Sequence, residues 1–581
     1  MFRRAVLALT MVGVTGASVV SAEAHGGDAG RFDRPKVGFA APWTQLREGN
    51  PEQVNLDRAP IDAALRQIDE WTRTNPSQPP VPKPLMAGVV TLLAHEGVIV
   101  SRSASGYAVR YSDAAGTELP AEQRVPMRKD TIFDMASISK LFTSIAVMQL
   151  VEQGKVDVDA PVSRYLPEFG VNGKAGITVK QLLIHTSGLI AFIPLWSMYP
   201  DKASRLQAVM DIAPKHVPGS TYEYSDLNLI TLGVLIERLT GSTLDNVVSK
   251  GITEPLGMTD TGYNPPSSKL DRIAATEYQS APPRGIVRGQ VHDENAWSLG
   301  GVAGHAGIFS TASDMAVLAQ TLINGGIYAH RRILRPDTVR AMLTDYTANF
   351  PGYAHGLGFE LDRRFYMGGL SGPATAGHTG YTGTTLVLDL QSRSIAILLS
   401  NRVHVSRNWG SINPARETLA TGLAKALAVR PRHGRDAWYT GIGNSATATL
   451  STRELNTRGT AIRVTFDTFV DTEISDHLVL ESSSDGALWQ AVPVIARGRG
   501  APSGERTFLS GAGHRTWWNV LAEVPTVDKI FLRWRFSTDR TLTGRGVLLD
   551  NIKITEGSRT LLDGEKQPAA LDSQAWDRRI R

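Results

Sequence analysis

The spacing of hydrophobic positions divides the chain into two parts of different character. Before about residue 430, apolar residues at helical spacing, as over 61–71, alternate with short apolar runs typical of strands. Two of these runs, 89–94 and 98–101, flank Glu96-Gly97 and predict a β-hairpin. Beyond residue 435, short strands dominate the pattern. We therefore expect a domain of mixed helices and strands followed by an all-β domain.

One predicted helix is apolar nearly all round. It begins near Ser137, runs through Leu150 and stops at Gly154. A helix without a polar face belongs in the interior of a domain. Ser137 and Lys140 lie three positions apart at its start, so they share one face. Burial favours an uncharged lysine, which can accept the proton of a serine hydroxyl, and Ser137 is therefore a candidate nucleophile.

The C-terminal part has the alternation of strands with one buried face. Ile530, Leu532 and Trp534 alternate with Phe531 and two arginines. Asp485-Gly486 is a hairpin-turn signal. Strands are expected over 462–466, 478–481, 529–536 and 547–555. This pattern predicts a β-sandwich.

The two ends of the chain and the junction between the domains carry their own signals. Residues 1–24 combine Arg3 and Arg4, an apolar run and Ala22-Glu23-Ala24, as a secretory signal peptide does. The segment Arg430–Gly434 marks the junction. The expected order is a signal peptide (1–24), an extended lead-in (25–54), the catalytic domain (55–430), the β-sandwich (435–557) and a polar tail (558–581).

Composition and charge exclude several classes of protein. A chain of 581 residues with 42% hydrophobic and 20% charged residues is typical of a globular protein of two or three domains. It contains no cysteine, so an exported form uses no disulfides. The net charge of +5 is small for so large a surface, and we expect no nucleic-acid partner. The apolar run of the leader is short for a bilayer span, so we expect no stable membrane span after cleavage.

Three short motifs follow one another in a fixed order. Ser137-x-x-Lys140 is followed by Tyr224-Ser225-Asp226 and then by His378-Thr379-Gly380. In this order they resemble the motifs of the serine β-lactamase and penicillin-binding-protein superfamily, in the branch of class C β-lactamases, DD-carboxypeptidases, D-aminopeptidases and esterases. The resemblance covers roughly residues 55–430. It implies an α/β, β-lactamase/transpeptidase-like fold, with an antiparallel sheet flanked by helices and a helical subdomain. The C-terminal part resembles jelly-roll sandwiches appended to secreted peptidases.

The resemblance also assigns catalytic roles to four residues. Ser137 would attack the substrate, while Tyr224 and Lys140 would shuttle its proton. The backbone N–H groups of Ser137 and Tyr381 would form the oxyanion hole. An adjacent ammonium is expected to lower the pKa of the Tyr224 phenol. The alternative for Tyr224 is a buried tyrosine that makes one hydrogen bond.

Two motif positions depart from the pattern of the superfamily. Asp226 stands where asparagine is usual, and its carboxylate cannot donate a hydrogen bond and favours a charged Lys140. His378 replaces the usual lysine, is mostly neutral at pH 7 and would hold substrate carboxylates less firmly. The resemblance implies substrate contacts for Asp226, His378, Thr379 and Gly380.

Asn401 and Arg402 follow the predicted strand 395–399. Class C enzymes place carboxylate-binding residues in a similar stretch, so both are candidate substrate contacts. A capped loop explains the two residues equally well. His185 lies among turn-forming residues, and we expect it to tie that turn to neighbouring backbone.

No cofactor is expected in the catalytic domain. His292-Asp293-Glu294 are adjacent and lack the spacing of a metal site, so they predict a polar loop beside the cleft. His305 is a weak candidate for lining the site. In jelly-roll modules of secreted peptidases acidic loops often hold calcium, and the candidate ligands here are Asp467, Asp471, Glu473 and Asp550.

Together these features predict a secreted serine hydrolase that acts through an acyl-enzyme on Ser137. The leading substrate class is a D-amino-acid peptide or cell-wall peptide, as for a DD-carboxypeptidase, with ester cleavage close behind. Two alternatives remain open. One is a β-lactamase, and the other is a penicillin-recognising sensor that is acylated and never turns over.

Overall fold

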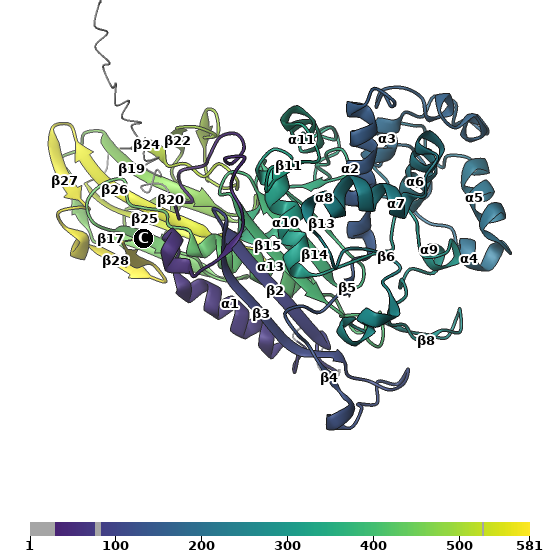
Figure 1. Cartoon of the computed structure of the whole chain (residues 1–581). Coiled ribbons are helices and arrows are strands. Elements are labelled where there is room, and N and C mark those ends of the chain that lie inside the picture. Colours follow the sequence, from purple (N-terminus) through teal and green to yellow (C-terminus); the bar gives the residue numbers. More distant parts are fainter. Residues whose placement is uncertain (1–28, 76–82, 526–527, 581) are drawn as a thin grey trace, which may run out of the picture.

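The computed structural model describes residues 29–75, 83–525 and 528–580. The expected signal peptide lies outside these residues. Figure 1 shows a helix-rich part at one end of the molecule and a sandwich of strands at the other. The predicted fold class, an α/β β-lactamase-like domain followed by a C-terminal β-sandwich, is confirmed. None of the described helices is both long enough and apolar enough to span a bilayer.

The catalytic domain is built on an eight-stranded sheet. Its order is β1-β3-β2-β15-β14-β13-β12, with β4 paired to β3, and only β1 and β3 are parallel. The strands are β1 (Arg47–Glu48), β2 (Gly88–His95), β3 (Val98–Val109), β4 (Val125–Pro126), β12 (Glu360–Leu361), β13 (Thr375–Thr379), β14 (Thr384–Asp389) and β15 (Ser394–Ser400). The predicted hairpin turn is confirmed, since β2 and β3 join at Glu96 and Gly97, both with positive φ.

Helices cover both faces of this sheet. One face packs against α1 and α13, and the other packs against α2 and α10. The helical subdomain lies beyond α2 and includes α3 to α7 (Figure 1). The helices are α1 (Arg58–Glu70), α2 (Ser139–Glu152), α3 (Val179–Leu183), α4 (Leu195–Met198), α5 (Lys202–Asp211), α6 (Asp226–Thr240), α7 (Leu244–Val248), α8 (Glu254–Leu256), α9 (Glu294–Ser298), α10 (Ala312–Ile323), α11 (Pro336–Met342), α12 (Arg364–Met367) and α13 (Asn413–Ala426). The helix α2 is buried on nearly every side, as its apolar sequence predicts.

The chain reverses direction just after His378. It forms a hairpin in which β13 and β14 pair in antiparallel register. The N–H of Gly380 donates to Thr384 O at 2.8 Å and closes the turn. Gly383 has a φ of 110°, which only glycine adopts readily, so this glycine permits the reversal.

The C-terminal sandwich packs two sheets face to face. Between them Trp518, Trp534 and Phe466 are buried, and the rings of Phe466 and Trp534 meet edge to face at 5.6 Å. The first sheet has the order β23 (Glu505–Arg506), β22 (Val494–Arg497), β24 (Trp518–Val524), β19 (Ile462–Asp471), β26 (Gly546–Glu556), β16 (Ala437–Thr440) and β29 (Asp577–Arg579), with β27 (Arg559–Asp563) on β26. The second has the order β21 (Gln490–Ala491), β20 (His477–Ser483), β25 (Lys529–Ser537), β17 (Thr447–Thr452) and β28 (Leu571–Gln574), with β18 (Leu455–Asn456) on β25.

The prediction that residues 558–581 form a polar tail separate from the sandwich is wrong. Residues 559–579 contribute β27, β28 and β29 to the two sheets of the sandwich. The tail is polar because its strands lie at sheet edges, yet Leu562, Leu571 and Trp576 point into the core and are buried. Three apolar side chains spaced along a polar stretch therefore suffice to order it.

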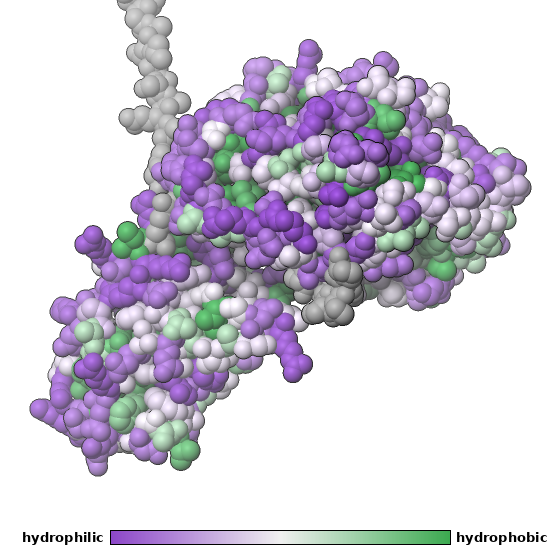
Figure 2. Space-filling view, turned by 90° about the horizontal axis from the view of Figure 1, so that it is seen from below, coloured by the Kyte–Doolittle hydropathy of each residue, from purple (hydrophilic) through white to green (hydrophobic). Residues whose placement is uncertain are grey.

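One of the hydrophobic cores is shared by the catalytic domain and the sandwich. Phe32 of the lead-in packs with α1 and α13 and with Phe469 and Leu548 of the sandwich. At this boundary the guanidinium of Arg515 lies 2.6 Å from the Asp389 carboxylate, with side chains only 1% and 0% exposed. Figure 2 shows the sandwich projecting from the larger domain, with hydrophobic residues in small groups on that face. The lead-in is thus mostly extended, but it is also an integral part of the core.

Candidate active site

Ser137 lies in a 3₁₀ turn, Ala136–Ile138, immediately before α2. Ala136 has a φ of 46°, an uncommon conformation for a residue with a side chain. The Asp134 carboxylate holds this turn, because it accepts from Ala136 N at 2.8 Å and from His292 N at 2.5 Å. The nucleophile candidate is therefore presented by a strained turn on a rigid, buried helix.

Lys140 is almost fully buried, with 1% of its side chain exposed. Its ammonium donates to Ser137 Oγ at 2.9 Å and to the carbonyl of His305 at 3.2 Å. It also lies 2.8 Å from Asp226 Oδ1. Burial alone would lower the pKa of Lys140, but the ion pair with the Asp226 carboxylate and the contacts with Tyr224 outweigh burial and raise it. The expectation that burial keeps this lysine neutral is therefore wrong, whereas the expected effect of Asp226 is confirmed.

Tyr224 lies just before α6 and faces the same site. The Lys140 ammonium is 4.9 Å from the centre of its ring. Burial raises the pKa of the Tyr224 phenol, and the opposing effect of Lys140 does not reverse this shift. The expectation of a lowered pKa is therefore wrong, because the phenol is buried and Asp226 adds a negative charge beside it. In the resting site both Tyr224 and Lys140 hold their protons.

His185 positions the segment that carries Tyr224. Its Nδ1 accepts from Ser225 N at 3.1 Å, and Asn228 Nδ2 lies 3.2 Å away. Its ring packs against that of Tyr224 with the centroids 4.6 Å apart. Burial lowers the pKa of His185 well below its ordinary value, so the ring is neutral. The prediction of a histidine that ties a turn is confirmed.

Hydrogen bonds hold the turn between β13 and β14 against the backbone just before Ser137. Thr382 Oγ1 donates to Asp134 O at 2.7 Å, and Thr384 Oγ1 donates to Met135 O at 3.1 Å. A Cβ on Gly380 would lie 2.4 Å from Met135 O, so only glycine allows this approach. Tyr381, at the tip of the turn, lines the same cavity as Ser137. This placement agrees with the two N–H groups expected to bind an oxyanion.

His378 is buried in the wall of the cavity. Its Nδ1 lies 2.7 Å from Thr379 O, a carbonyl that can only accept, so Nδ1 carries the proton. Burial, together with the nearby Lys140, lowers the pKa of His378 to about 3. The ring is neutral, as its replacement of lysine predicts, and it supplies no charge for a substrate carboxylate.

The prediction that Asn401 contacts the substrate is wrong. Its side chain is buried, and Nδ2 donates to the carbonyls of Tyr107 and Ala108 on β3 at 3.2 and 3.1 Å. The amide therefore fastens the end of β15 to β3 instead of facing the cavity. Arg402, the next residue, does line the cavity, and its guanidinium donates to Arg407 O at 2.8 Å.

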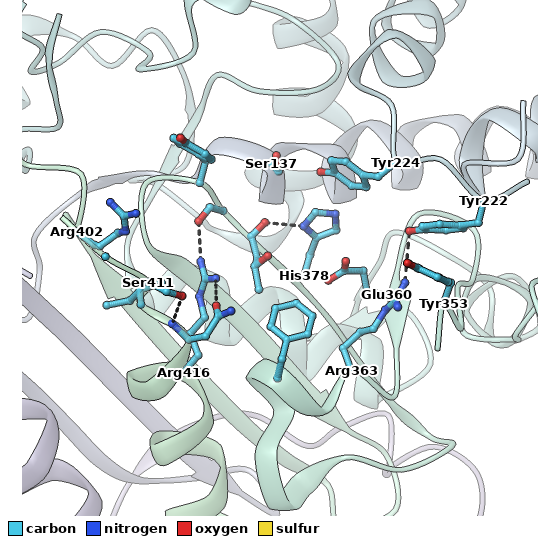
Figure 3. Close-up of a pocket in the computed structure, with 17 residues that line it drawn as sticks. Ser137, Tyr222, Tyr224, Tyr353, Glu360, Arg363, His378, Arg402, Ser411 and Arg416 are labelled. Carbon is cyan, nitrogen blue, oxygen red and sulfur yellow. Dashed lines mark hydrogen bonds between the residues drawn. The ribbon is translucent and has the colours of Figure 1, made fainter. Parts of the chain in front are cut away.

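A cavity of about 480 Å³ opens beside Ser137 (Figure 3). It contains the predicted Tyr224, His378, Thr379, Gly380 and Tyr381. The sequence reasoning missed the other polar and aromatic lining residues, which are Tyr222, Tyr353, Glu360, Arg363, Phe365, Ser411, Asn413 and Arg416. Most of them lie on short loops and on the start of α13, outside any motif, so only the folded chain brings them together.

Arg416 supports the turn that carries Tyr381. Its guanidinium is buried and donates to Gly380 O at 2.8 Å and to Thr384 O at 3.1 Å. In Figure 3 it lies at the floor of the cavity, opposite Ser137. The first turn of α13 thus fixes the hairpin that completes the site.

A second cavity, of about 320 Å³, opens on another side of Ser137. His305, only a weak candidate from the sequence, lines it together with Asp293, and Nε2 of the histidine lies 2.9 Å from Asp293 Oδ1. The polar atoms of Asp226, Asp293 and His305 lie within 4.8 Å of one another, close enough to hold a cation. His292 and Glu294, the neighbours of Asp293 in the chain, line the same cavity. Arg407 also lines it, and its guanidinium forms an ion pair with the Glu294 carboxylate.

In the sandwich, two of the expected calcium ligands serve another purpose. Asp467 contacts the Arg432 and His433 side chains, and Asp550 accepts from the backbone N–H of both residues. These carboxylates fasten the junction between the domains. Glu473 instead lies in a cluster with Asp476 and Asp539 whose carboxylate oxygens come within 4.8 Å of one another. The expected calcium therefore stays a prediction, with a different set of candidate ligands.

The chain matches the family model described as Beta-lactamase over residues 81–419. It is 34% identical over 402 residues to an Escherichia coli (strain K12) protein named "Putative D-alanyl-D-alanine carboxypeptidase", which covers 63% of this chain and 87% of that protein. A protein of the same name from Salmonella paratyphi B is 33% identical over 429 residues, covering 67% of this chain and 93% of that protein.

Solved structures that are similar to this chain include the hydrolase EstCE1, described as having promiscuous acyltransferase activity. It is 22% identical with a TM-score of 0.49, and the match covers 62% of this chain and 98% of EstCE1. A penicillin-binding protein homolog from Caulobacter crescentus is 23% identical with a TM-score of 0.49, covering 63% of this chain and 97% of that homolog.

Proposed function

This chain belongs to the Beta-lactamase family of hydrolases, and from that premise we propose that it is an exported D-amino-acid peptidase acting through an acyl-enzyme on Ser137. One observation carries the proposal. Lys140 joins Ser137 and Asp226 by contacts of 2.9 and 2.8 Å beneath the Tyr224 ring, at the edge of a substrate-sized cavity.

The resting protonation of the site sets the first step. Because Lys140 and Tyr224 both hold their protons, the pair must lose one proton before it can accept another. Ser137 Oγ then attacks the substrate carbonyl while its proton passes to Tyr224, beside the fixed charge of Lys140. The N–H groups of Ser137 and Tyr381 receive the oxyanion.

The later steps return the site to its starting state. The carbonyl-to-leaving-group bond breaks, and Tyr224 gives its proton to the leaving nitrogen or oxygen. A water molecule then attacks the ester on Ser137 and loses a proton to the same pair. The acid product leaves as Ser137 Oγ recovers its proton, so atoms and protons balance.

The relatives named for D-alanyl-D-alanine cleavage favour a D-peptide as the substrate class. Ester cleavage is the second candidate, because a specific residue favours it. Asp226 cannot donate a hydrogen bond to a substrate amide carbonyl, as the usual asparagine does, so amide substrates lose that contact. Export is proposed from the leader-like residues 1–24.

A substrate panel tests this function directly. Purified protein would be assayed with a D-Ala-D-Ala peptide, a short-chain p-nitrophenyl ester and a chromogenic cephalosporin. Release of D-alanine supports the peptidase, whereas a stable adduct without turnover, seen by mass spectrometry, identifies a penicillin sensor. Preferred hydrolysis of the cephalosporin would instead identify a β-lactamase.

A substitution of Ser137 tests the proposed nucleophile. Ser137→Ala should abolish labelling by a fluorescent penicillin or fluorophosphonate and lower hydrolysis by about 10³-fold or more. Undiminished turnover by a folded Ser137→Ala protein would contradict the assignment.

A further inference from the structure

The two cavities that meet at Ser137 carry opposite charge. Three guanidinium groups and one carboxylate line the first cavity, from Arg363, Arg402, Arg416 and Glu360. Three carboxylates and one guanidinium line the second, from Asp226, Asp293, Glu294 and Arg407. Ser137, Tyr224 and Tyr381 line both. A molecule that extends across Ser137 therefore passes from an acidic environment into a basic one.

The acidic cavity also contains a buried acceptor without a donor. The His305 side chain is only 1% exposed, and its Nε2 lies 2.9 Å from Asp293 Oδ1. A carboxylate only accepts, so Nε2 carries the proton and Nδ1 presents a lone pair. Among the described residues, Nδ1 has no hydrogen-bond partner. A buried acceptor left without a donor costs free energy, so the wall of this cavity holds one unsatisfied acceptor.

The arrangement suits an ammonium group better than a metal ion. Lys140 already places one positive charge 2.8 Å from Asp226, and this charge repels a divalent ion more strongly than a singly charged ammonium. Asp293 Oδ1 is engaged by His305 and by the N–H of Ala296 at 2.7 Å. One polar atom each of Asp226, Asp293 and His305 lies within 4.8 Å of the other two, a spacing that the three N–H donors of a primary ammonium can span.

We propose that the acidic cavity binds a protonated amine on the acyl side of the scissile bond, and that the basic cavity binds the carboxylate of the leaving group. This inference rests on the proposed peptidase function and specifies its substrate. In a peptide the attacked carbonyl lies toward the amino end, and the leaving residue carries the carboxyl end. The charge pattern therefore selects a short D-peptide with an amine on its acyl side and a free terminal carboxylate.

Two matched pairs of peptides test the amine. The first pair is D-Ala-D-Ala and N-acetyl-D-Ala-D-Ala, which differ only in the α-amine. The second is Nα-acetyl-L-Lys-D-Ala-D-Ala and its Nα,Nε-diacetyl form, which differ only in the side-chain amine. Release of D-alanine should show kcat/KM at least about tenfold higher for the free amine in one pair, the scale of one hydrogen bond to a charged group. The preferred pair then identifies which amine is bound.

Asp293→Asn links this preference to the cavity. The substitution removes the charge but keeps an oxygen that can accept from Ala296 N at the start of α9. We expect KM to rise for the free amine only, so that the preference falls to within about twofold. Turnover of the acetylated peptide reports that the variant is folded. Asp271→Asn, at an exposed residue that lines neither cavity, should retain the preference.

The outcomes separate this inference from the proposed function. Release of D-alanine with no preference in either pair, or a preference that survives in Asp293→Asn, would overturn the inference alone. Activity that is lost with EDTA and restored by a divalent ion would assign the cluster to a metal and also overturn it. Absence of D-alanine release from all four peptides would overturn the proposed function, and the inference with it.

Discussion

The Lys140 ammonium and the Asp226 carboxylate lie 2.8 Å apart, with the lysine buried and the aspartate partly accessible. This ion pair occupies the position where the superfamily pattern has an uncharged asparagine. It raises the pKa of Lys140 and, through the same negative charge, helps to raise that of Tyr224. The pair that we propose as acceptor of the Ser137 proton is therefore tuned by one carboxylate.

Asp226→Asn should shift the pH dependence of the rate. Activity is expected to rise with pH as the Lys140–Tyr224 pair loses a proton. Removal of the carboxylate destabilises both protonated groups, so the rising limb should move to lower pH. The substitution also supplies an amide donor, and the ratio of amide to ester hydrolysis should increase. The measurement is a pH–rate series on one ester and one peptide, with Asp271→Asn as control. An unchanged profile and ratio would show that Asp226 does not tune the site.

Tyr224→Phe should slow acylation by about 10²-fold or more, the usual scale for loss of a general base. The ring and its packing on His185 remain, so the loss would report the hydroxyl alone. Stopped-flow acylation by a fluorescent penicillin would measure it. Tyr222→Phe is the matched control, because Tyr222 lines the same cavity and has no described contact with Lys140. Equal losses in the two variants would contradict a proton-transfer role for Tyr224.

Arg515→Met should destabilise the whole chain. It leaves Asp389 as an uncompensated buried charge at the boundary of the two domains, which typically costs about 3–5 kcal/mol. Thermal and urea unfolding would measure this loss. Arg463→Met breaks an exposed ion pair with Glu523 in the same sandwich and should change little.

A chain that ends near Arg430 should be insoluble or strongly destabilised, because it lacks the sandwich residues of the shared core. The sequence suggests a catalytic domain able to bury its own core, but the shared core would lose Phe469 and Leu548. Truncation would also leave Phe32 without its contact to Phe469, whose ring centre lies 6.2 Å away. A soluble, active truncated protein would show that the sandwich is dispensable for folding.

Glu277 should make stability fall at acid pH. Burial would raise the pKa of this carboxyl, but hydrogen bonds from His292 and Arg407 lower it from 4.5 to about 2. A folded-state pKa below the unfolded value stabilises the protein above about pH 4.5, and this contribution is lost as the pH falls toward 2. Glu277→Gln should therefore flatten the loss of stability between pH 5 and 2. Glu254→Gln, at an exposed position, is the control, and equal slopes in both variants would contradict the prediction.

Calcium should raise the melting temperature if the cluster of Glu473, Asp476 and Asp539 binds it. Burial and the nearby Asp539 carboxylate raise the pKa of Glu473 and of Asp476. A bound cation would stabilise the ionised form of both carboxyls. Differential scanning calorimetry with calcium and with EDTA would measure the shift. Asp476→Asn should abolish it, whereas Asp485→Asn, in another loop of the sandwich, should not. Identical melting temperatures with calcium and EDTA would contradict the site.

Features that depend on neighbours in the chain could be predicted before the fold was known. The contact between Ser137 and Lys140 follows from a spacing of three residues on a helix. The Thr311 cap of α10 and the turn at Glu96-Gly97 follow in the same way from local backbone geometry. The order of the three motifs likewise indicated the fold class, because each motif marks one element of a shared architecture.

Features that depend on packing could not be predicted in the same way. Asn401 is polar, as are Asn413 and Arg416 of α13, yet Asn401 is buried against β3 while the two α13 residues line the cavity. The polar tail likewise becomes three strands because a few apolar side chains reach the sandwich core.

By itself, therefore, the sequence determined the candidate nucleophile, its lysine neighbour, the succession of elements and the family fold. Only the tertiary structure decided that Lys140 is charged, that Tyr224 keeps its proton and that two cavities of opposite charge meet at Ser137. The physical reason is that burial and electrostatic interaction depend on distances between segments far apart in the chain, such as those carrying Lys140, Asp226 and Asp293. Those distances are set by the packing of helices and loops, whereas a local motif sets only the residues within one or two turns.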